Sequence, residues 1–196
     1  RHAKSRGLRV GAIPAATERL TAERVRRLKA AGLDQMALSI DGPTAAEHDT
    51  FRGVDGSFAH TMAGASFAQA AGLPLQINTV LANWNLERFD AIRDLVESLG
   101  VVFWEVFFLI PTGRGAQLQG LTHEQYEHLF AKLYDLQMRS PFIVKITEAP
   151  QYRVYVTQQE RSRTQSDGPP ATRLRSLLAR QTGPGGSVGQ APRGVN

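Results

Sequence analysis

The 196-residue sequence contains no cysteine. This absence excludes disulfides, thiolate nucleophiles, zinc fingers and any iron–sulfur cluster held by thiolates of these residues. Long apolar runs are missing too. None approaches the roughly 20 residues that cross a bilayer, and the charged opening at 1–9 leads into no apolar stretch like that of a secretory signal. We therefore expect a cytoplasmic protein without a membrane partner.

Positive charge is concentrated at the two ends of the chain. The formal net charge is +5, from 23 basic and 18 acidic residues, and 42% of the residues are hydrophobic, enough for a sizeable core. Residues 1–10 and 157–196 each carry a net charge of +4, whereas 11–156 carry −3. A nucleic-acid-binding domain usually gathers basic residues on its folded surface. We therefore expect no nucleic-acid partner.

Strand-like and helix-like segments alternate along most of the chain. Apolar segments predict four strands, at 8–13, 35–41, 73–81 and 101–110. Helices are predicted between and after them, each behind a capping residue: Thr21, Ser57, Asn85 and Thr122, the last with Gln125 in a capping box. Such alternation is typical of a parallel α/β sheet covered by helices, either a barrel or an open doubly wound sheet.

The C-terminal part follows a different pattern. Residues 142–156 are predicted to be extended, without a clear helix after them. From Thr157 onward the composition shifts to Gln, Ser, Arg, Gly and Pro, which predicts a linker with a short basic helix at 171–181. The expected division is a core at 1–156 and a linker at 157–196.

Polar side chains recur near the C-terminal ends of three neighbouring predicted strands. Alternation along each strand puts Ser39 on one face with Asp41, and Gln76 on one face with Asn78, while Glu105 lies among aromatic residues of the next strand. Ligands of parallel α/β proteins bind at these strand ends. The pattern indicates a polar ligand site, although Ser39 also suits a small core residue, Asp41 a turn, and Asn78 a backbone hydrogen bond.

Two further features carry weaker signals. Four histidines, at 48, 60, 123 and 128, lack a second ligand at metal-binding spacing, so we expect no metal site. The loop Pro111-Thr-Gly-Arg-Gly115 follows a predicted strand, and its backbone amides suit a phosphate or an adenine, although a plain connection is the simpler interpretation.

A compound motif carries a family resemblance. It consists of Ser39-Ile-Asp-Gly-Pro43, Glu47-His48-Asp49, Phe51-Arg52-Gly53 and Gly56-Ser57-Phe58, followed by AAGLPLQINTVLANWN and FFLIPTGRG. The combination resembles the middle of a radical S-adenosylmethionine (radical SAM) enzyme, of the branch that carries a C-terminal SPASM or SPASM-like extension. The resemblance covers about residues 7–156.

The resemblance implies a fold and a chemistry. The fold would be a partial (β/α) TIM-like barrel with parallel strands and outer helices. An intact enzyme of this family cleaves S-adenosylmethionine reductively with an electron from a 4Fe-4S cluster. An electron donor supplies that electron to the cluster. The resulting 5′-deoxyadenosyl radical abstracts hydrogen from a small-molecule or peptide substrate.

The resemblance also implies roles for particular residues. Ser39 and Asp41 would lie by the ribose and the methionyl end of S-adenosylmethionine, and Asn78 would offer a donor and an acceptor from the next strand. Arg52 would pair with the methionyl carboxylate, because a guanidinium fork fits two oxygens. Backbone groups of one segment would approach the adenine: Ile110, Pro111, Thr112 and Gly113.

The sequence departs from the family pattern at the cluster. The family's CxxxCxxC motif is absent, so we expect an internal segment of a radical SAM enzyme that is inactive on its own. Two alternatives are a cluster-less S-adenosylmethionine-binding module and a non-functional gene fragment. A third is an aldolase- or isomerase-type barrel enzyme, which would need a catalytic lysine or a second carboxylate, with Lys145 and Glu105 as the nearby candidates.

Overall fold

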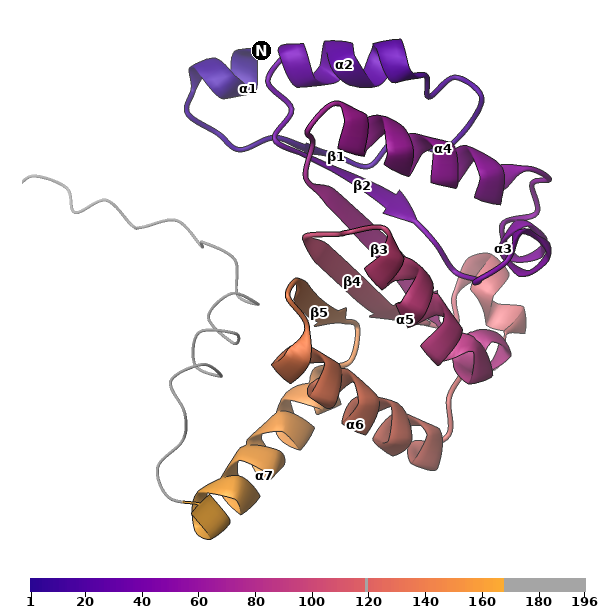
Figure 1. The fold of residues 1–196 in the computed structure, drawn as a ribbon. Coiled ribbons are helices and arrows are strands. Elements are labelled where there is room, and N and C mark those ends of the chain that lie inside the picture. Colours follow the sequence, from indigo (N-terminus) through magenta and orange to yellow (C-terminus); the bar gives the residue numbers. More distant parts are fainter. Residues whose placement is uncertain (119, 168–196) are drawn as a thin grey trace, which may run out of the picture. The chain divides into compact units, whose positions relative to one another are not determined.

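The computed structural model describes residues 1–118 and 120–167, and its centre is a parallel sheet of five strands (Figure 1). The strands are β1 (Gly11–Ala12), β2 (Gln35–Ser39), β3 (Leu75–Leu81), β4 (Phe103–Phe108) and β5 (Ile143–Thr147). Their order in the sheet is the order along the chain. A doubly wound sheet reverses its strand order at a switch point, so the uninterrupted order identifies a partial (β/α) barrel.

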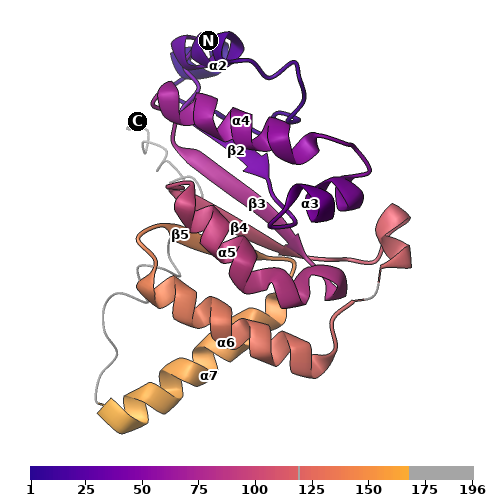
Figure 2. The same ribbon diagram turned by 45° about the vertical axis from the view of Figure 1, so that its right-hand side comes forward.

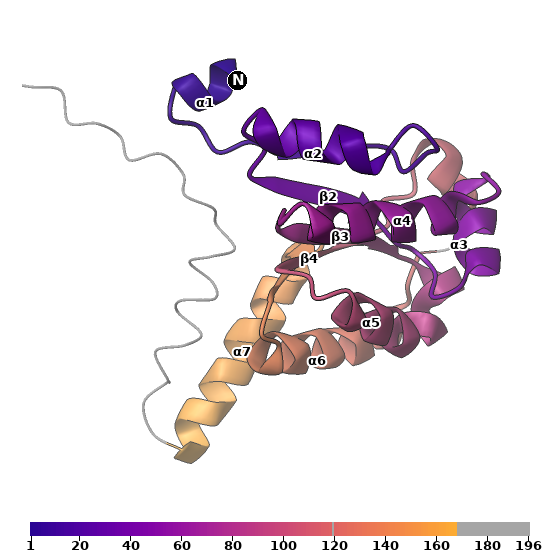
Figure 3. The ribbon, with the colours of Figure 1, turned by 45° about the horizontal axis from the view of Figure 1, so that its top comes forward.

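Helices connect successive strands. They are α1 (His2–Ser5), α2 (Ala22–Ala30), α3 (Ala45–Arg52), α4 (Ser57–Ala70), α5 (Phe89–Ser98), α6 (His123–Arg139) and α7 (Pro150–Asp167), with 3₁₀ turns η1 (Asn83–Arg88) and η2 (Gly113–Gln117). Figures 2 and 3 show α4, α5 and α6 side by side along the sheet. None of the helices in the described ranges is long and apolar enough to span a bilayer.

The two faces of the sheet differ in burial. Along β3 and β4, buried residues alternate strictly with partly exposed ones. The buried set contacts the helices: Phe89 of α5 stacks on Trp104 of β4 at a ring distance of 5.8 Å. Trp104 Nε1 donates to Thr79 Oγ1 at 2.9 Å, and that hydroxyl donates to the carbonyl of Ile40 at 2.7 Å. Three strands are thus tied together beneath the helices, and the other face is left more accessible.

Two of the four predicted helix caps are confirmed, and the other two, Ser57 and Asn85, are wrong. Thr21 accepts from Arg24 N, and Thr122 forms the predicted capping box with Gln125. Ser57, however, is the first residue of α4 and does not cap it. The carboxylate of Asp49 takes that role from α3, because it accepts from Gly56 N at 2.8 Å and from Phe58 N at 2.7 Å. An acid here also faces the positive end of the helix dipole.

The prediction of an extended segment over 142–156 is wrong beyond β5. Glu148 adopts a left-handed φ of 63°, and α7 begins at Pro150, where proline suits the first turn of a helix. Tyr152 and Val156 are both buried, and their spacing of four residues is helical. The helix continues through 157–167, within the segment predicted as a linker. The predicted helix at 171–181 lies outside the described residues, and the domain division at 156 stays a prediction.

Replacing Asp49 tests which residue caps α4. We expect Asp49→Ala to lower the free energy of unfolding by about 1 kcal/mol, because two backbone N–H groups lose their acceptor. Ser57→Ala should lower it by less than half as much. Urea denaturation of both variants measures the difference, and a larger loss in Ser57→Ala would contradict the assignment.

Candidate functional site

Four polar residues form one row across the accessible face of the sheet. The strand register pairs Ser39 with Asn78, Asn78 with Glu105, and Glu105 with Lys145. All four side chains belong to the partly exposed set rather than to the helix-covered core. The predicted gathering of Ser39 and Asn78 on one face is therefore confirmed, and the row extends two strands further.

Hydrogen bonds connect this row to its neighbours along the strands. Gln35 Nε2 donates to Gln76 Oε1 at 2.6 Å, and Gln76 Nε2 donates to Asn78 Oδ1 at 2.7 Å and to Glu105 Oε2 at 3.1 Å. The other oxygen of Glu105 accepts from Lys145 Nζ at 2.7 Å and from Thr147 Oγ1 at 2.9 Å. The polar face is thus held in one arrangement before any ligand arrives.

Asp41 lies at the end of β2 and holds the loops around the site. Its carboxylate is fully buried. Oδ1 accepts from Val80 N at 2.9 Å, and Oδ2 lies 2.5 Å from a terminal guanidinium nitrogen of Arg52. Its backbone N–H donates to His48 Nδ1 at 3.1 Å, and its carbonyl accepts from Asn85 Nδ2 at 2.9 Å. One residue thereby connects β2, β3, α3 and η1.

A glycine allows α3 to approach this strand end. A Cβ at Gly42 would lie 2.8 Å from Glu47 Cβ and 2.8 Å from His48 N. Such distances are not found for real Cβ atoms, so any other residue at position 42 would push α3 away. Because His48 and Arg52 both reach Asp41 from α3, the missing side chain at Gly42 is a requirement for their contacts.

Asn85 does not cap a helix as predicted. It is fully buried in η1. Its Oδ1 accepts from Ala82 N at 2.9 Å, and its Nδ2 donates to the carbonyls of Asp41 and Val80 at 2.9 and 2.8 Å. The side chain thus satisfies backbone groups at the ends of both β2 and β3 instead of capping α5.

Burial shifts the pKa values of two neighbouring groups, Asp41 and His48. Burial raises the pKa of the Asp41 carboxyl, and the nearby Arg52 charge and the Val80 amide oppose that rise. Burial lowers the pKa of His48, whereas the neighbouring Asp41 charge raises it. A neutral His48 is what the geometry requires, since Nδ1 must accept the proton of the Asp41 amide.

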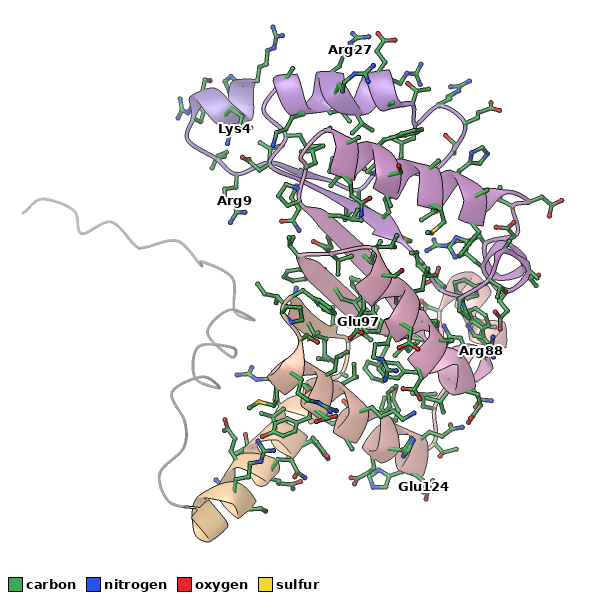
Figure 4. All side chains as sticks on the ribbon, viewed as in Figure 1. Lys4, Arg9, Arg27, Arg88, Glu97 and Glu124 are labelled. Atoms are coloured by element: carbon green, nitrogen blue, oxygen red, sulfur yellow. The ribbon has the colours of Figure 1, made fainter. Side chains whose placement is uncertain are left out.

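A cleft of about 920 Å³ opens beside Asp41, between α3, η1 and the segment that follows β4. One wall is aromatic: Phe51 and Trp84 stack at 4.6 Å with an interplanar angle of 15°. At the junction of α3 and η1, Arg88 (labelled in Figure 4) places its Nε 2.6 Å from Glu47 Oε1. The lining residues include Glu47, Phe51, Arg52, Val80, Trp84, Leu109 and Thr112.

The structure brings some of the predicted site residues together and separates others. Arg52 and Thr112 line the same cleft, and Ser39 and Asn78 are neighbours on the accessible face. Ile110 is 52% exposed, and Pro111 and Gly113 are exposed as well. Asp41 has no exposed surface, and both of its carboxylate oxygens are engaged. This geometry offers a ligand no direct contact with Asp41.

Sequence reasoning missed the parts of the site that are assembled by packing. His48 is 1% exposed and touches Asp41, although its spacing from other polar residues carries no ligand signal. The aromatic wall joins Phe51 to Trp84, which lie 33 positions apart in the sequence. A second hollow, of about 590 Å³, lies before β4 and β5 and includes Glu97 (Figure 4). It is at the opposite end of these strands from the cleft.

Comparisons with known proteins give named relatives, although no family model matches the chain. The chain is 40% identical over 153 residues to the AdoMet-dependent heme synthase of Nitratidesulfovibrio vulgaris, covering 77% of the chain and 41% of that protein. It is 41% identical over 140 residues to the Methanosarcina barkeri protein of the same name, covering 71% and 40%. A PqqA peptide cyclase of Methylocella silvestris is 41% identical over 81 residues, covering 41% and 22%.

Solved structures show a similar fold. The structure of Streptococcus suis SuiB bound to the precursor peptide SuiA aligns with a TM-score of 0.56 and 11% sequence identity. The alignment covers 89% of this chain and 38% of that one. At this identity the likeness concerns the fold alone. The chain spans 40–44% of the length of the heme synthases that it matches.

The contact between His48 and Asp41 predicts a pH dependence of stability. The pKa of His48 is lowered in the folded state from its ordinary 6.5. As the pH falls, this histidine is therefore protonated in the unfolded chain before it is protonated in the folded protein. The stability that neutral His48 contributes is complete above 6.5 and is lost as the pH falls through the folded value. Asp41, whose pKa is raised, contributes with the opposite sign: its share is fully present below its ordinary 3.8 and is lost as the pH rises through the folded value.

We expect His48→Asn, which keeps an acceptor that does not titrate, to lose less free energy of unfolding than the parent between about pH 7.5 and about pH 5.5. Urea denaturation at the two pH values measures this loss. His123→Asn, at an exposed position, is the matched control and should behave like the parent. Equal losses in His48→Asn and the parent would contradict the assignment.

Proposed function

The chain belongs to the SPASM-type branch of the radical S-adenosylmethionine superfamily, and we propose from this premise that it is the S-adenosylmethionine-binding part of an enzyme that makes heme. Extent of similarity supports a tetrapyrrole substrate: the heme synthases match 71–88% of the chain, and the PqqA peptide cyclases 39–44%. A peptide substrate is the second candidate, because the M. silvestris cyclase reaches 41% identity within its shorter match.

The single observation that carries the proposal is the ion pair between Arg52 and Asp41 at the edge of the cleft. One guanidinium nitrogen is held by the buried carboxylate, while the Arg52 side chain remains 35% exposed and lines the cleft. The other N–H groups of the planar guanidinium suit a carboxylate. We propose that Arg52 binds the methionyl carboxylate of S-adenosylmethionine. Asp41 then acts through Arg52, as a positioning residue, instead of touching the ribose.

Ser39 and Asn78 suit the ribose. Neither the hydroxyl of Ser39 nor Nδ2 of Asn78 has a hydrogen-bond partner among the described residues, and the strand register places them side by side. The segment from Ile110 to Gly113 would contact the adenine through backbone groups, and Thr112 already lines the cleft. In an intact enzyme, one electron from a 4Fe-4S cluster would cleave the bound S-adenosylmethionine to methionine and a 5′-deoxyadenosyl radical, and that radical would abstract hydrogen from the substrate.

The residues of this chain do not fit a 4Fe-4S cluster. The sequence has no cysteine, and within the described ranges no three His, Asp or Glu side chains gather where they could hold a metal ion. A cluster and its electron donor therefore depend on groups outside these 196 residues. An S-adenosylmethionine-binding module would bind without cleavage. A non-functional gene fragment is not favoured, because identities of 39–41% extend over most of the chain.

Binding of S-adenosylmethionine to the 196-residue chain tests the site. We expect Arg52→Met to raise the Kd about tenfold or more, since a charge-assisted hydrogen bond contributes roughly 1.5–3 kcal/mol. Asn78→Ala should weaken binding in the same direction. Arg93→Met is the matched control, because Arg93 is 32% exposed and is also ion-paired, but lies on α5. Calorimetric titration measures each Kd, and an unchanged Kd in Arg52→Met would contradict the proposed role.

Cleavage is tested separately from binding. After anaerobic incubation with iron, sulfide and dithionite, we expect the chain alone to form no 5′-deoxyadenosine from S-adenosylmethionine, because no thiolate can hold a cluster. Chromatography of the reaction detects the product. Formation of 5′-deoxyadenosine by this chain would contradict the expectation.

A further inference from the structure

We infer that Lys145, at the far end of the row Ser39–Asn78–Glu105–Lys145, binds a carboxylate of the substrate. The inference rests on the proposed function, because it takes the Ser39 end of the row as the place of S-adenosylmethionine. Some hydrogen-bonding groups of the row are already engaged within the protein, and others are left for a ligand.

Acceptors in the middle of the row are engaged by the protein itself. Both oxygens of Glu105 accept hydrogen bonds, Oε1 from Lys145 and Thr147 and Oε2 from Gln76. The Oδ1 of Asn78 accepts from the other N–H of Gln76. Glu105 therefore keeps hydrogen bonds from two neutral donors, Thr147 and Gln76, even when Lys145 also binds a ligand.

Donors are what remain for a ligand. Lys145 carries three N–H groups, and Glu105 is its one partner among the described residues. The side chain of Lys145 is 35% exposed, whereas that of Glu105 is 14% exposed, so the ammonium is the more accessible member of the pair. Asn78 Nδ2 is likewise unengaged. Apart from the hydroxyl of Ser39, the open groups of the row are an amide donor and a cation, and these select a ligand with anionic acceptors.

The residues around Lys145 indicate what the rest of the ligand is like. Phe103 and Phe107 flank Glu105 on the same face of β4, and Ile143 precedes Lys145 on β5; all three are partly exposed. An apolar floor strengthens the attraction between opposite charges. The site thus fits a molecule with an apolar or planar body and a carboxylate at its edge.

The separation along the row suits two ligands at once. Asn78 and Lys145 lie two strands apart, which is about 10 Å at the usual spacing of about 4.8 Å. One end of the row would hold the ribose, and the other end would hold the substrate carboxylate. Glu105 lies between them and orients Lys145.

The test uses Fe-coproporphyrin III, a tetrapyrrole with four carboxylates, and its tetramethyl ester, which lacks the charges. Absorbance titration of the 196-residue chain should show tighter binding of the acid than of the ester. Lys145→Met should raise the Kd for the acid about tenfold and leave that for the ester unchanged. Lys145→Arg should restore binding of the acid to within about threefold, which excludes a folding defect. Lys132→Met, at a lysine that is 34% exposed and paired with Asp90, should match the parent.

The outcomes separate this inference from the proposed function. Equal binding of the acid by Lys145→Met and the parent, or equal affinity for acid and ester in the parent, would overturn the role of Lys145. Lys145→Met should bind S-adenosylmethionine as the parent does. If the parent binds the acid through Lys145 but does not bind S-adenosylmethionine, the proposed cofactor site fails while the carboxylate site stands.

Discussion

The buried carboxylate of Asp41 is the constraint on which the site depends. A carboxylate without exposed surface is costly unless its oxygens are engaged, and here an amide of β3 and a guanidinium of α3 engage them. The same residue uses its backbone N–H and C=O to hold His48 and Asn85. Because four elements converge on one residue, the cleft, its aromatic wall and the exposed part of Arg52 are positioned together.

The two faces of the sheet have different roles. The helix-covered face carries the apolar core, in which Trp104 and Thr79 tie the strands together. The accessible face carries a polar row whose register runs across four strands. Parallel strands bring such residues into line only because each crossover returns the chain to the same edge of the sheet. The two ends of the row, where we propose that cofactor and substrate bind, are therefore parts of one surface. Such an arrangement suits a reaction that transfers hydrogen between two bound molecules.

Much of this arrangement could be predicted from the sequence, because it is local. Alternation within 35–41 and 73–81 placed Ser39 and Asn78 on one face, and the helix caps at Thr21 and Thr122 follow from short motifs. The rest depends on contacts between distant residues. The sequence around Asn85 is typical of a helix cap, but in the folded protein its side chain donates to the carbonyls of Asp41 and Val80. The helix α7 was missed because its buried positions face Phe130 of α6, a partner that no local pattern reveals.

The central claim is that S-adenosylmethionine binds at the C-terminal edge of β2, β3 and β4. The most direct measurement is the change in backbone amide NMR shifts of the chain when S-adenosylmethionine is added. We expect the shifts to concentrate at Ser39, Asn78, Arg52 and Thr112, with little change in the hollow between α5 and α6. Shifts concentrated around Glu97 and Arg139 in that hollow, or no saturable shifts at all, would contradict it.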